Sequence, residues 1–204
     1  MTAQIEAVVS DMGVHAAKTG MLANAAIVEA VAAAVGRSRD SVPCRRSGDR
    51  RQQRRSLLDD EGLLAMKNEL LSRAHAVTPN IPEAEMLSGV AIRTDEDRRE
   101  AARRIFALGP VYVVITGGHS SSDRIIDLVY DGDVFTDYAV DRVAGRHTHG
   151  TGCAFSAALA SHLAIGRSLH EAVPLAQEYV AGRHSSRAGA RPRRGTDAPL
   201  LASR

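Results

Sequence analysis

The sequence predicts a layered α/β domain built around a largely parallel β-sheet. Segments with apolar residues at helical spacing alternate along the chain with short apolar runs. One such run, residues 111–115, is continuous and β-branched, as strands buried on both faces are. Aromatic residues make up only 3% of the chain and Trp is absent, which disfavours an all-β sandwich. The length of 204 residues fits one domain.

In the first half of the chain, the pattern predicts three helices and one strand. Residues 24–35 are Ala-rich, with apolar residues at helical spacing. Residues 59–74 form an amphipathic helix with acidic residues in its first turn. Residues 76–78 follow as a short strand, and a helix over residues 83–87 begins next to Pro82. We expect the apolar face of the second helix to consist of Leu63, Met66, Leu70 and Leu71.

The second half of the chain contains clear helix caps and a hairpin signal. Thr94 is a typical N-cap, Asp131-Gly132 is a hairpin turn, and Ser168 with Glu171 forms a capping box. We expect helices over residues 94–108, 153–165 and 168–180, and strands over residues 111–115, 124–130 and 134–140.

The overall net charge of +2 hides two Arg-rich segments. Residues 37–55 hold eight Arg and two Asp, and residues 183–204 hold six Arg and one Asp. The remainder is acidic, with 12 Lys and Arg against 21 Asp and Glu. Such charge runs are typical of disordered tails or of nucleic-acid-binding patches. The shortage of aromatic residues, however, counts against a nucleic-acid platform.

Cysteine content and hydropathy indicate a cytoplasmic protein. Cys44 and Cys153 are too few for a disulfide framework or a zinc site. No run reaches the length of a membrane span, and no signal peptide opens the chain. We therefore expect a reducing, cytoplasmic setting without membrane contact.

The most informative stretch is the glycine loop of residues 147–153, which leads directly into an apolar helix. Glycines before a helix turn backbone N–H groups toward an anion, and the helix dipole adds partial positive charge. Gly150, Thr151 and Gly152 followed by Cys153 therefore suit a phosphoryl group in transfer. No Gly-Lys-Ser/Thr follows, so the loop is not a Walker loop. On spacing alone, a tight turn with a buried cysteine is the better explanation.

Two further stretches end predicted strands with polar residues or glycines. Asn80 and Glu83 lie just beyond one strand end, where ligands of parallel sheets gather, and together they suit a hydrated Mg²⁺. Ordinary helix capping is the alternative reading. Thr116, Gly117 and Gly118 end the next strand and leave room for a nucleotide. A plain strand-to-loop turn is the alternative there.

Taken together, these stretches resemble the hydroxymethylpyrimidine/phosphomethylpyrimidine kinases of thiamine biosynthesis, within the ribokinase-like superfamily. The motifs Lys-Thr-Gly-Met-Leu, Thr-Pro-Asn-Ile-Pro-Glu-Ala-Glu, Gly-Gly-His and Thr-His-Gly-Thr-Gly-Cys occur in the family's order. The cysteine is the specific part, because most of the superfamily has Asp there. The resemblance covers residues 2–36 and 56–182 and implies a three-layer α/β fold with a mostly parallel sheet.

The resemblance implies a role for each matching residue. Cys153 is the base toward the substrate hydroxymethyl group, and Gly150, Thr151 and Gly152 form the anion hole. A helix N-terminus favours the thiolate form of a cysteine. Met21 matches a position in the pyrimidine pocket. The implied nucleotide site consists of Thr78, Asn80, Thr116, Gly117 and Gly118, and the implied Mg²⁺ site of Asn80 and Glu83. The family often has Lys where Thr116 stands.

The chain also departs from the family pattern. The family's first units have no counterpart, and the core strand with Asp-Pro-Val, expected between Val35 and Leu57, is replaced by Arg-rich sequence. With permitted codons, residues 40–54 read one base later give Ile-Pro-Phe-Leu-Val-Val-Asp-Pro-Val-Ile-Val-Val-Ser-Ser-Gly. The tail from Arg183 likewise gives Ala-Ile-Arg-His-Ala-Pro-Gly-Leu-Gly-His.

We therefore interpret both Arg-rich segments as frameshifted translation. Residues 1–182 then form a partial kinase domain with an aberrant segment at 37–55, and residues 183–204 form an aberrant or disordered tail. We expect residues 40–55 to form no central strand, because buried Arg charges without partners are costly. A genuine basic insertion and tail is the alternative.

The function that this resemblance implies is phosphorylation of hydroxymethylpyrimidine and its monophosphate, with ATP and Mg²⁺, in thiamine diphosphate biosynthesis. Alternatives are an inactive remnant of that kinase, a pyridoxal-type kinase of the same superfamily, and a basic-loop nucleic-acid binder. The expected partner is a small pyrimidine, and members of the family are usually homodimers.

Overall fold

The computed structural model describes residues 2–20, 22–37, 42–45, 59–118, 123–142 and 150–188. The helices are α1 (Thr2–Met12), α2 (Ala25–Arg37), α3 (Asp60–Ala65), α4 (Ile81–Ser88), α5 (Asp95–Phe106), α6 (Thr151–Ala164) and α7 (Leu169–Ala188). A π-helical turn, η1 (Met66–Leu70), and a 3₁₀ turn, η2 (Leu71–Arg73), follow α3. The strands are β1 (Ala16–Thr19), β2 (Val42–Arg45), β3 (Ala76–Val77), β4 (Tyr112–Ile115), β5 (Arg124–Tyr130) and β6 (Phe135–Asp141).

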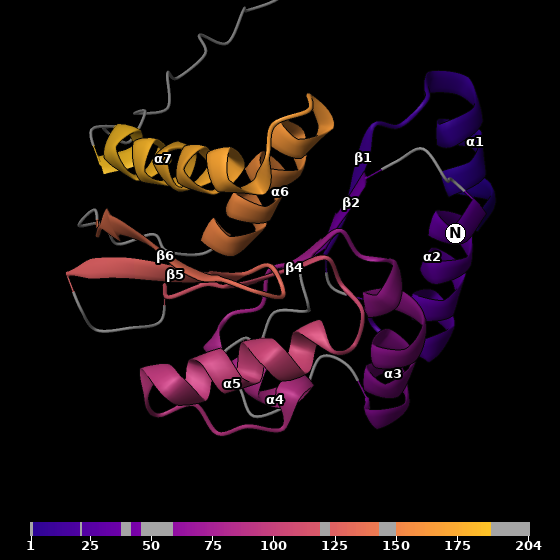
Figure 1. Cartoon of the computed structure of the whole chain (residues 1–204). Coiled ribbons are helices and arrows are strands. Elements are labelled where there is room, and N and C mark those ends of the chain that lie inside the picture. The colour runs from indigo at the N-terminus through magenta and orange to yellow at the C-terminus, as the bar shows by residue number, and fades with distance from the viewer. Residues whose placement is uncertain are drawn as a thin grey trace, which may run out of the picture.

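The strands form one mostly parallel sheet in the order β1-β2-β3-β4-β5-β6. Pairings from β1 through β4 are parallel, and the pairs β4–β5 and β5–β6 are antiparallel. Helices α6 and α7 lie on one face of the sheet, and α4 and α5 lie on the other (Figure 1). This arrangement confirms the layered α/β fold that the alternating pattern predicts.

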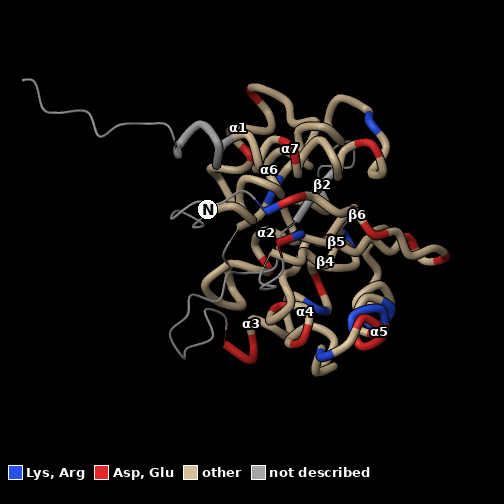
Figure 2. The backbone as a smooth tube through the Cα atoms, turned by 90° about the vertical axis from the view of Figure 1, so that its left-hand side faces the viewer, with Lys and Arg blue, Asp and Glu red and all other residues tan. Residues whose placement is uncertain are grey.

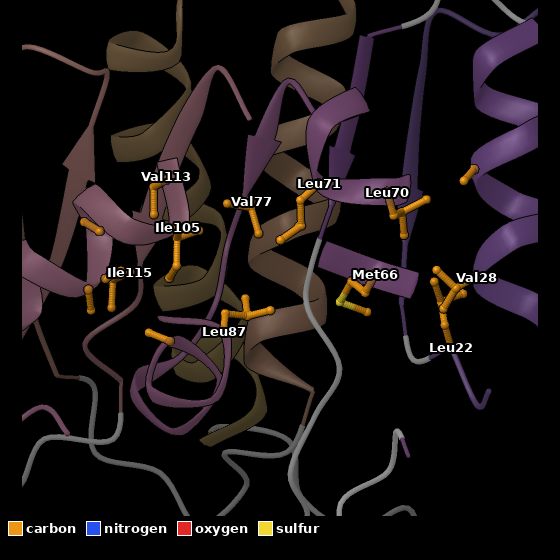
Figure 3. Close-up of a cluster of buried hydrophobic side chains, with 14 of the residues drawn as sticks. Leu22, Val28, Met66, Leu70, Leu71, Val77, Leu87, Ile105, Val113 and Ile115 are labelled. Carbon is orange, nitrogen blue, oxygen red and sulfur yellow. The ribbon is translucent and has the colours of Figure 1, made fainter. Parts of the chain in front are cut away.

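Strand residues alternate between two hydrophobic cores, one on each face of the sheet. Val77, Val113 and Ile115 pack with the helices from α2 to α5 (Figure 3). Ala76 and Val114 pack instead with α6 and α7. Because successive strand residues point to opposite faces, short apolar strands such as β3 and β4 supply both layers.

Local capping determines where several helices begin, as the sequence predicts. Thr94 caps α5 in a capping box with Asp97. The Ser168 backbone N–H donates to Glu171 Oε2 at 2.9 Å, and the Glu171 N–H donates to Ser168 Oγ at 3.4 Å, at the start of α7. Asn24 Oδ1 accepts from the Ile27 N–H at 3.0 Å next to α2. Each cap satisfies a backbone donor of the first turn.

The helix expected over residues 59–74 is present as α3, η1 and η2. Its predicted apolar face is confirmed: Met66, Leu70 and Leu71 are buried and Leu63 is partly buried. In the π-helical turn, the Leu71 N–H donates to the Met66 carbonyl. No unusual residue type marks this turn, so the sequence pattern does not predict it.

The expectation that residues 40–55 form no central strand is wrong for Val42–Arg45. These four residues form β2, which pairs in parallel with β1 and with β3. Whether a segment forms a strand depends strongly on its neighbours, and here β1 and β3 flank β2. Most of β2 is uncharged, unlike the rest of the segment. Residues 38–41 and 46–58 lie outside the described part of the chain.

The expected boundary of the disordered tail also needs correction. Helix α7 continues to Ala188, six residues into the segment 183–204. Helix propagation costs little once a helix exists, and neither Gly nor Pro occurs between Arg183 and Ala188. Residues 189–204 lie outside the described part.

Charge on the described residues is mixed, with acidic and basic positions side by side on α5 (Figure 2). Arg103 and Arg104 of α5 both contact Glu100. Across the ranges that the structure describes, no helix has the length and apolar character needed to cross a membrane.

Candidate functional site

Strands β3 and β4 lie side by side and run parallel, and their ends bring together the predicted stretch at Asn80 and the one at Thr116. Asn80 and Thr116 form a parallel bridge just beyond these strands. The Thr116 N–H donates to the Pro79 carbonyl oxygen at 2.8 Å. This carboxyl edge of a parallel sheet is where ligands of open α/β folds bind.

Asn80 and Glu83 form a reciprocal capping box at the start of α4. Asn80 Oδ1 accepts from the Glu83 N–H, and Glu83 Oε2 accepts from the Asn80 N–H, both at 2.9 Å. Asn80 is 3% exposed and Glu83 fully buried. Asn80 Nδ2 has no hydrogen-bond partner among the described residues. One oxygen of each side chain therefore takes part in helix capping, as the alternative interpretation predicts. The buried Asn80 Nδ2 group remains an unused donor.

The end of β4 approaches β5 so closely that only glycine fits at position 117. A Cβ atom on the buried Gly117 would lie 2.1 Å from the Ile126 carbonyl oxygen. Gly118 is exposed, and a Cβ atom there would meet no atom of the described residues within 4 Å. The two glycines therefore differ: packing against Ile126 excludes any larger side chain at position 117, whereas Gly118 borders open space.

This difference predicts that Gly117→Ala destabilises the protein by about 2 kcal/mol, within the usual cost of overpacking. Gly118→Ala is the matched control and is expected to change the free energy of unfolding by less than about 0.5 kcal/mol. Urea unfolding followed by circular dichroism measures both. Equal stability of the two variants would contradict the close approach of β4 to β5.

Cys153 lies at the N-terminus of a helix, as predicted. Gly150, with φ of 82°, is the N-cap of α6, and the Ala154 N–H donates to the Gly150 carbonyl at 2.9 Å. Thr151, Gly152 and Cys153 therefore belong to the first turn, whose backbone N–H groups point out of the helix end. The first turn holds no acidic side chain, so the positive end of the helix dipole is not neutralised there.

The thiol of Cys153 is exposed rather than buried as a small apolar group. One turn further along α6, the buried Ser156 donates from Oγ to the Gly152 carbonyl at 3.0 Å. Helix α6 packs against β1 and β2, and β2 lies beside β3 in the sheet. The approach of the Cys153 loop to Asn80 and Glu83 stays a prediction. Met21 lies outside the described residues, as do residues 147–149 of the glycine loop.

The remaining nucleotide-site residue that we predict, Thr78, is 2% exposed and lies between β3 and the capping box. No group of three or more His, Cys, Asp or Glu side chains with the geometry of a metal site occurs in the described ranges. The described edge therefore offers backbone N–H groups and one amide donor for anions, and one carboxylate for a cation.

One buried charge beside this edge is absent from the predicted set. Asp127, on β5, is 3% exposed; Oδ1 accepts from the Gly117 N–H at 2.8 Å, and Oδ2 accepts from Gln177 Nε2 at 2.9 Å. Burial raises the pKa of the Asp127 carboxyl, while the Gly117 and Gln177 donors and the charge of Arg98 act in the opposite direction. The sequence signal for Asp127 is a single acidic residue between the apolar residues of an expected strand.

Comparison with known proteins finds relatives along most of the chain. Residues 1–196 match the phosphomethylpyrimidine kinase family. The hydroxymethylpyrimidine/phosphomethylpyrimidine kinase of Bacillus subtilis is 41% identical over 184 residues, which are 87% of this chain and 66% of that protein. The thiamine biosynthesis bifunctional protein ThiED of Geobacter sulfurreducens is 39% identical over 87% of this chain and 36% of its own length. The chain thus spans slightly less than two thirds of the Bacillus relative.

Solved structures of the same group share the fold. The pyridoxal kinase of Staphylococcus aureus in complex with AMP-PCP and pyridoxal has a TM-score of 0.80 at 34% identity, over 89% of this chain and 65% of that chain. A phosphomethylpyrimidine kinase from Clostridium difficile has a TM-score of 0.73 at 28% identity, over 88% of this chain and 73% of that chain.

Proposed function

The chain belongs to the phosphomethylpyrimidine kinase family, and on that premise we propose that its site transfers a phosphoryl group from ATP to hydroxymethylpyrimidine and to hydroxymethylpyrimidine phosphate. The reaction belongs to thiamine diphosphate biosynthesis. The observation that carries the proposal is the joining of the two strand ends by the Asn80–Thr116 bridge. It sets a buried Asn–Glu pair beside a glycine-bearing strand end at the ligand-binding edge of a parallel sheet.

We assign ATP to the edge formed by Thr78, Asn80 and Thr116–Gly118. Gly118 borders open space, so a nucleotide can approach the backbone there. Asn80 Nδ2 is a buried donor whose partner oxygen, Oδ1, is already held by the capping box. Such a donor suits a phosphate oxygen, because a buried N–H without an acceptor is costly. The S. aureus relative, which has been solved with AMP-PCP, is consistent with a nucleotide in this fold.

Asn80 and Glu83 also fit a magnesium ion as its protein ligands. Mg²⁺ is usually held by one or two carboxylates together with waters and substrate phosphates, and a single buried Glu83 carboxylate beside an amide oxygen meets that pattern. When bound, the ion neutralises charge on the phosphates. The residues themselves keep α4 and its capping box in place.

At α6, we assign Cys153 as the general base and Gly150, Thr151 and Gly152 as the cradle for the transferred phosphoryl group. The Cys153 thiolate takes the proton of the substrate hydroxymethyl group. The oxygen then forms a bond to the γ-phosphorus, the bond to the β,γ-bridging oxygen breaks, and ADP leaves with the electron pair. N–H groups at a helix N-terminus stabilise the charge on the transferred group. Met21 is assigned to the pyrimidine pocket by family resemblance.

A pyridoxal-type kinase is the second candidate. It is favoured by the higher TM-score of the S. aureus pyridoxal kinase, 0.80 against 0.73 for the C. difficile phosphomethylpyrimidine kinase. Both reactions phosphorylate a hydroxymethyl group on a nitrogen heterocycle, so the same base and anion cradle serve either. Substrate preference therefore separates the two candidates.

We further propose that residues 1–182 are the kinase domain and that the basic segments at 37–55 and from 183 onward are frameshifted. The alternative frame itself supports this, because it reads Phe-Leu-Val-Val at residues 42–45, a typical buried strand. The strand that Val42–Arg45 form as they stand runs against the expectation that we drew from the frameshift. We also propose, from the family resemblance, that the protein is a cytoplasmic homodimer that acts on a small-molecule substrate.

We expect the chain as it stands to be a poor enzyme. Turnover should fall well below the roughly 1–100 s⁻¹ of ordinary kinases, because charged residues flank a central strand. ATP consumption is measured with hydroxymethylpyrimidine, with its monophosphate and with pyridoxal. Turnover in the ordinary range would contradict the remnant hypothesis, and a preference for pyridoxal would replace the pyrimidine assignment.

A further inference from the structure

Among the residues that the structure describes, Asp127 is the one buried carboxylate near the site to which the proposed chemistry gives no role. It lies on β5 between Ile126 and Leu128, with its side chain on the face covered by α7. Burying a carboxylate is costly unless hydrogen bonds compensate. Both of its oxygens accept a hydrogen bond from a group that is itself buried. The energetic cost of burying Asp127 suggests that its carboxylate has a structural or functional role at this place.

The Asp127 carboxylate is connected to the strand end of the proposed nucleotide site. Oδ1 accepts directly from the Gly117 N–H at 2.8 Å. The residue before Gly117 is Thr116, whose N–H donates to the Pro79 carbonyl at 2.8 Å. Asp127, Gly117, Thr116 and Pro79 therefore form a continuous chain of hydrogen bonds and peptide links that ends at the Asn80 capping box.

The opposite side of Asp127 is held by α7. Gln177 Nε2 donates to Asp127 Oδ2 at 2.9 Å and to the Tyr138 carbonyl of β6 at 3.1 Å. One amide group thus ties the carboxylate to the neighbouring strand and to a helix. With both oxygens engaged, the carboxylate cannot rotate away from Gly117 without breaking a buried bond.

We propose that Asp127 is a positioning residue that fixes the Thr116–Gly118 strand end in the geometry that accepts the nucleotide, with Gln177 holding the carboxylate in place. The inference rests on the proposed function, because it takes that strand end as the nucleotide site. Steric packing alone does not fix the segment: contact with Ile126 limits how close Gly117 comes to β5, whereas the Asp127 bond prevents Gly117 from moving away.

The test compares two substitutions at Asp127 in the whole chain. Asp127→Asn keeps an oxygen that can accept from the Gly117 N–H and loses only the acceptor toward Gln177 Nε2. Asp127→Leu fills a similar volume and offers no acceptor. The probe is ADP, with affinity measured by calorimetry, and the second readout is hydrogen exchange of the Gly117 amide. Asp141→Asn is the matched control, since it makes the same change on an exposed carboxylate of β6.

We expect Asp127→Leu to weaken ADP binding by about tenfold and to speed Gly117 exchange by about tenfold, as the loss of one buried hydrogen bond implies. Asp127→Asn and Asp141→Asn should both stay within about threefold of the original chain. Unchanged ADP affinity in a folded Asp127→Leu variant overturns the proposal. So does a loss of affinity in Asp127→Asn equal to that in Asp127→Leu, because that would mark the charge, not the acceptor, as the active feature.

Two outcomes separate this proposal from the proposed function. If the original chain binds no ADP, the nucleotide assignment fails, and Gly117 exchange alone decides whether Asp127 fixes the strand end. If Asp127→Leu does not fold, Gln177→Met takes its place, because it releases the far oxygen of the carboxylate and leaves the Gly117 bond possible. Faster Gly117 exchange in that variant supports positioning through Gln177, and unchanged exchange overturns it.

Discussion

Replacing residues 40–54 with the fifteen residues of the alternative frame is expected to raise the thermal midpoint of unfolding by about 10 °C or more. The replacement changes β2 from Val-Pro-Cys-Arg to Phe-Leu-Val-Val. A strand between two parallel strands is normally covered on both faces, so large apolar side chains become buried there. At roughly 1.5–3 kcal/mol each, two further buried side chains contribute about 4 kcal/mol, and each kcal/mol corresponds to about 2–4 °C in a chain of this size.

The replacement also restores a backbone donor to the sheet. Pro43 pairs with Ala17 of β1 and has no N–H to donate; the alternative frame has Leu at that position. Differential scanning fluorimetry measures the midpoint. A variant with only residues 47–54 replaced is the control, because it removes Arg charges without altering β2. If that control melts as high as the full replacement, loss of charge repulsion explains the gain. If neither variant gains stability, the Arg-rich segment is genuine sequence.

The elements that the sequence predicts well are those fixed by local chemistry. The capping boxes at Thr94 and Ser168 need only residues three positions apart, and the Asp131-Gly132 turn joins two strands that pair directly. The position of Cys153 in the first turn of α6 follows in the same way from the glycines before it. For each of these features, one short window contains the whole physical cause.

The features that escape the sequence depend on partners far along the chain. Gln177 and Asp127 are fifty residues apart, and their bond exists only because α7 covers β5. Val42–Arg45 forms a strand because β1 and β3 leave a place between them, although its own composition argues against one. Helix α1 is missing from the expected elements even though its apolar residues, Ile5, Val8, Val9 and Met12, recur at helical spacing; none of its residues is buried.

Cys153→Ala is expected to lower the turnover number by about 10²–10⁴-fold, the usual cost of removing a general base. The experiment uses a frame-restored protein extended to the length of its relatives, so that the remaining parts of the site are present. The Cys153 thiol is exposed at the N-terminus of α6, where it can reach a substrate hydroxyl. Alanine has high helix propensity, so the first turn should persist and ADP affinity, measured by calorimetry, should stay within about threefold.

Cys153→Asp distinguishes a base from a packing residue at this position. A carboxylate at a helix N-terminus interacts favourably with the dipole and can accept a proton, so turnover should recover at least tenfold relative to Cys153→Ala. Unchanged turnover in Cys153→Ala would show that the thiol only fills space. Reduced turnover in all variants together with weakened ADP binding would place the effect in the shape of the α6 N-terminus, with no proton transfer at Cys153.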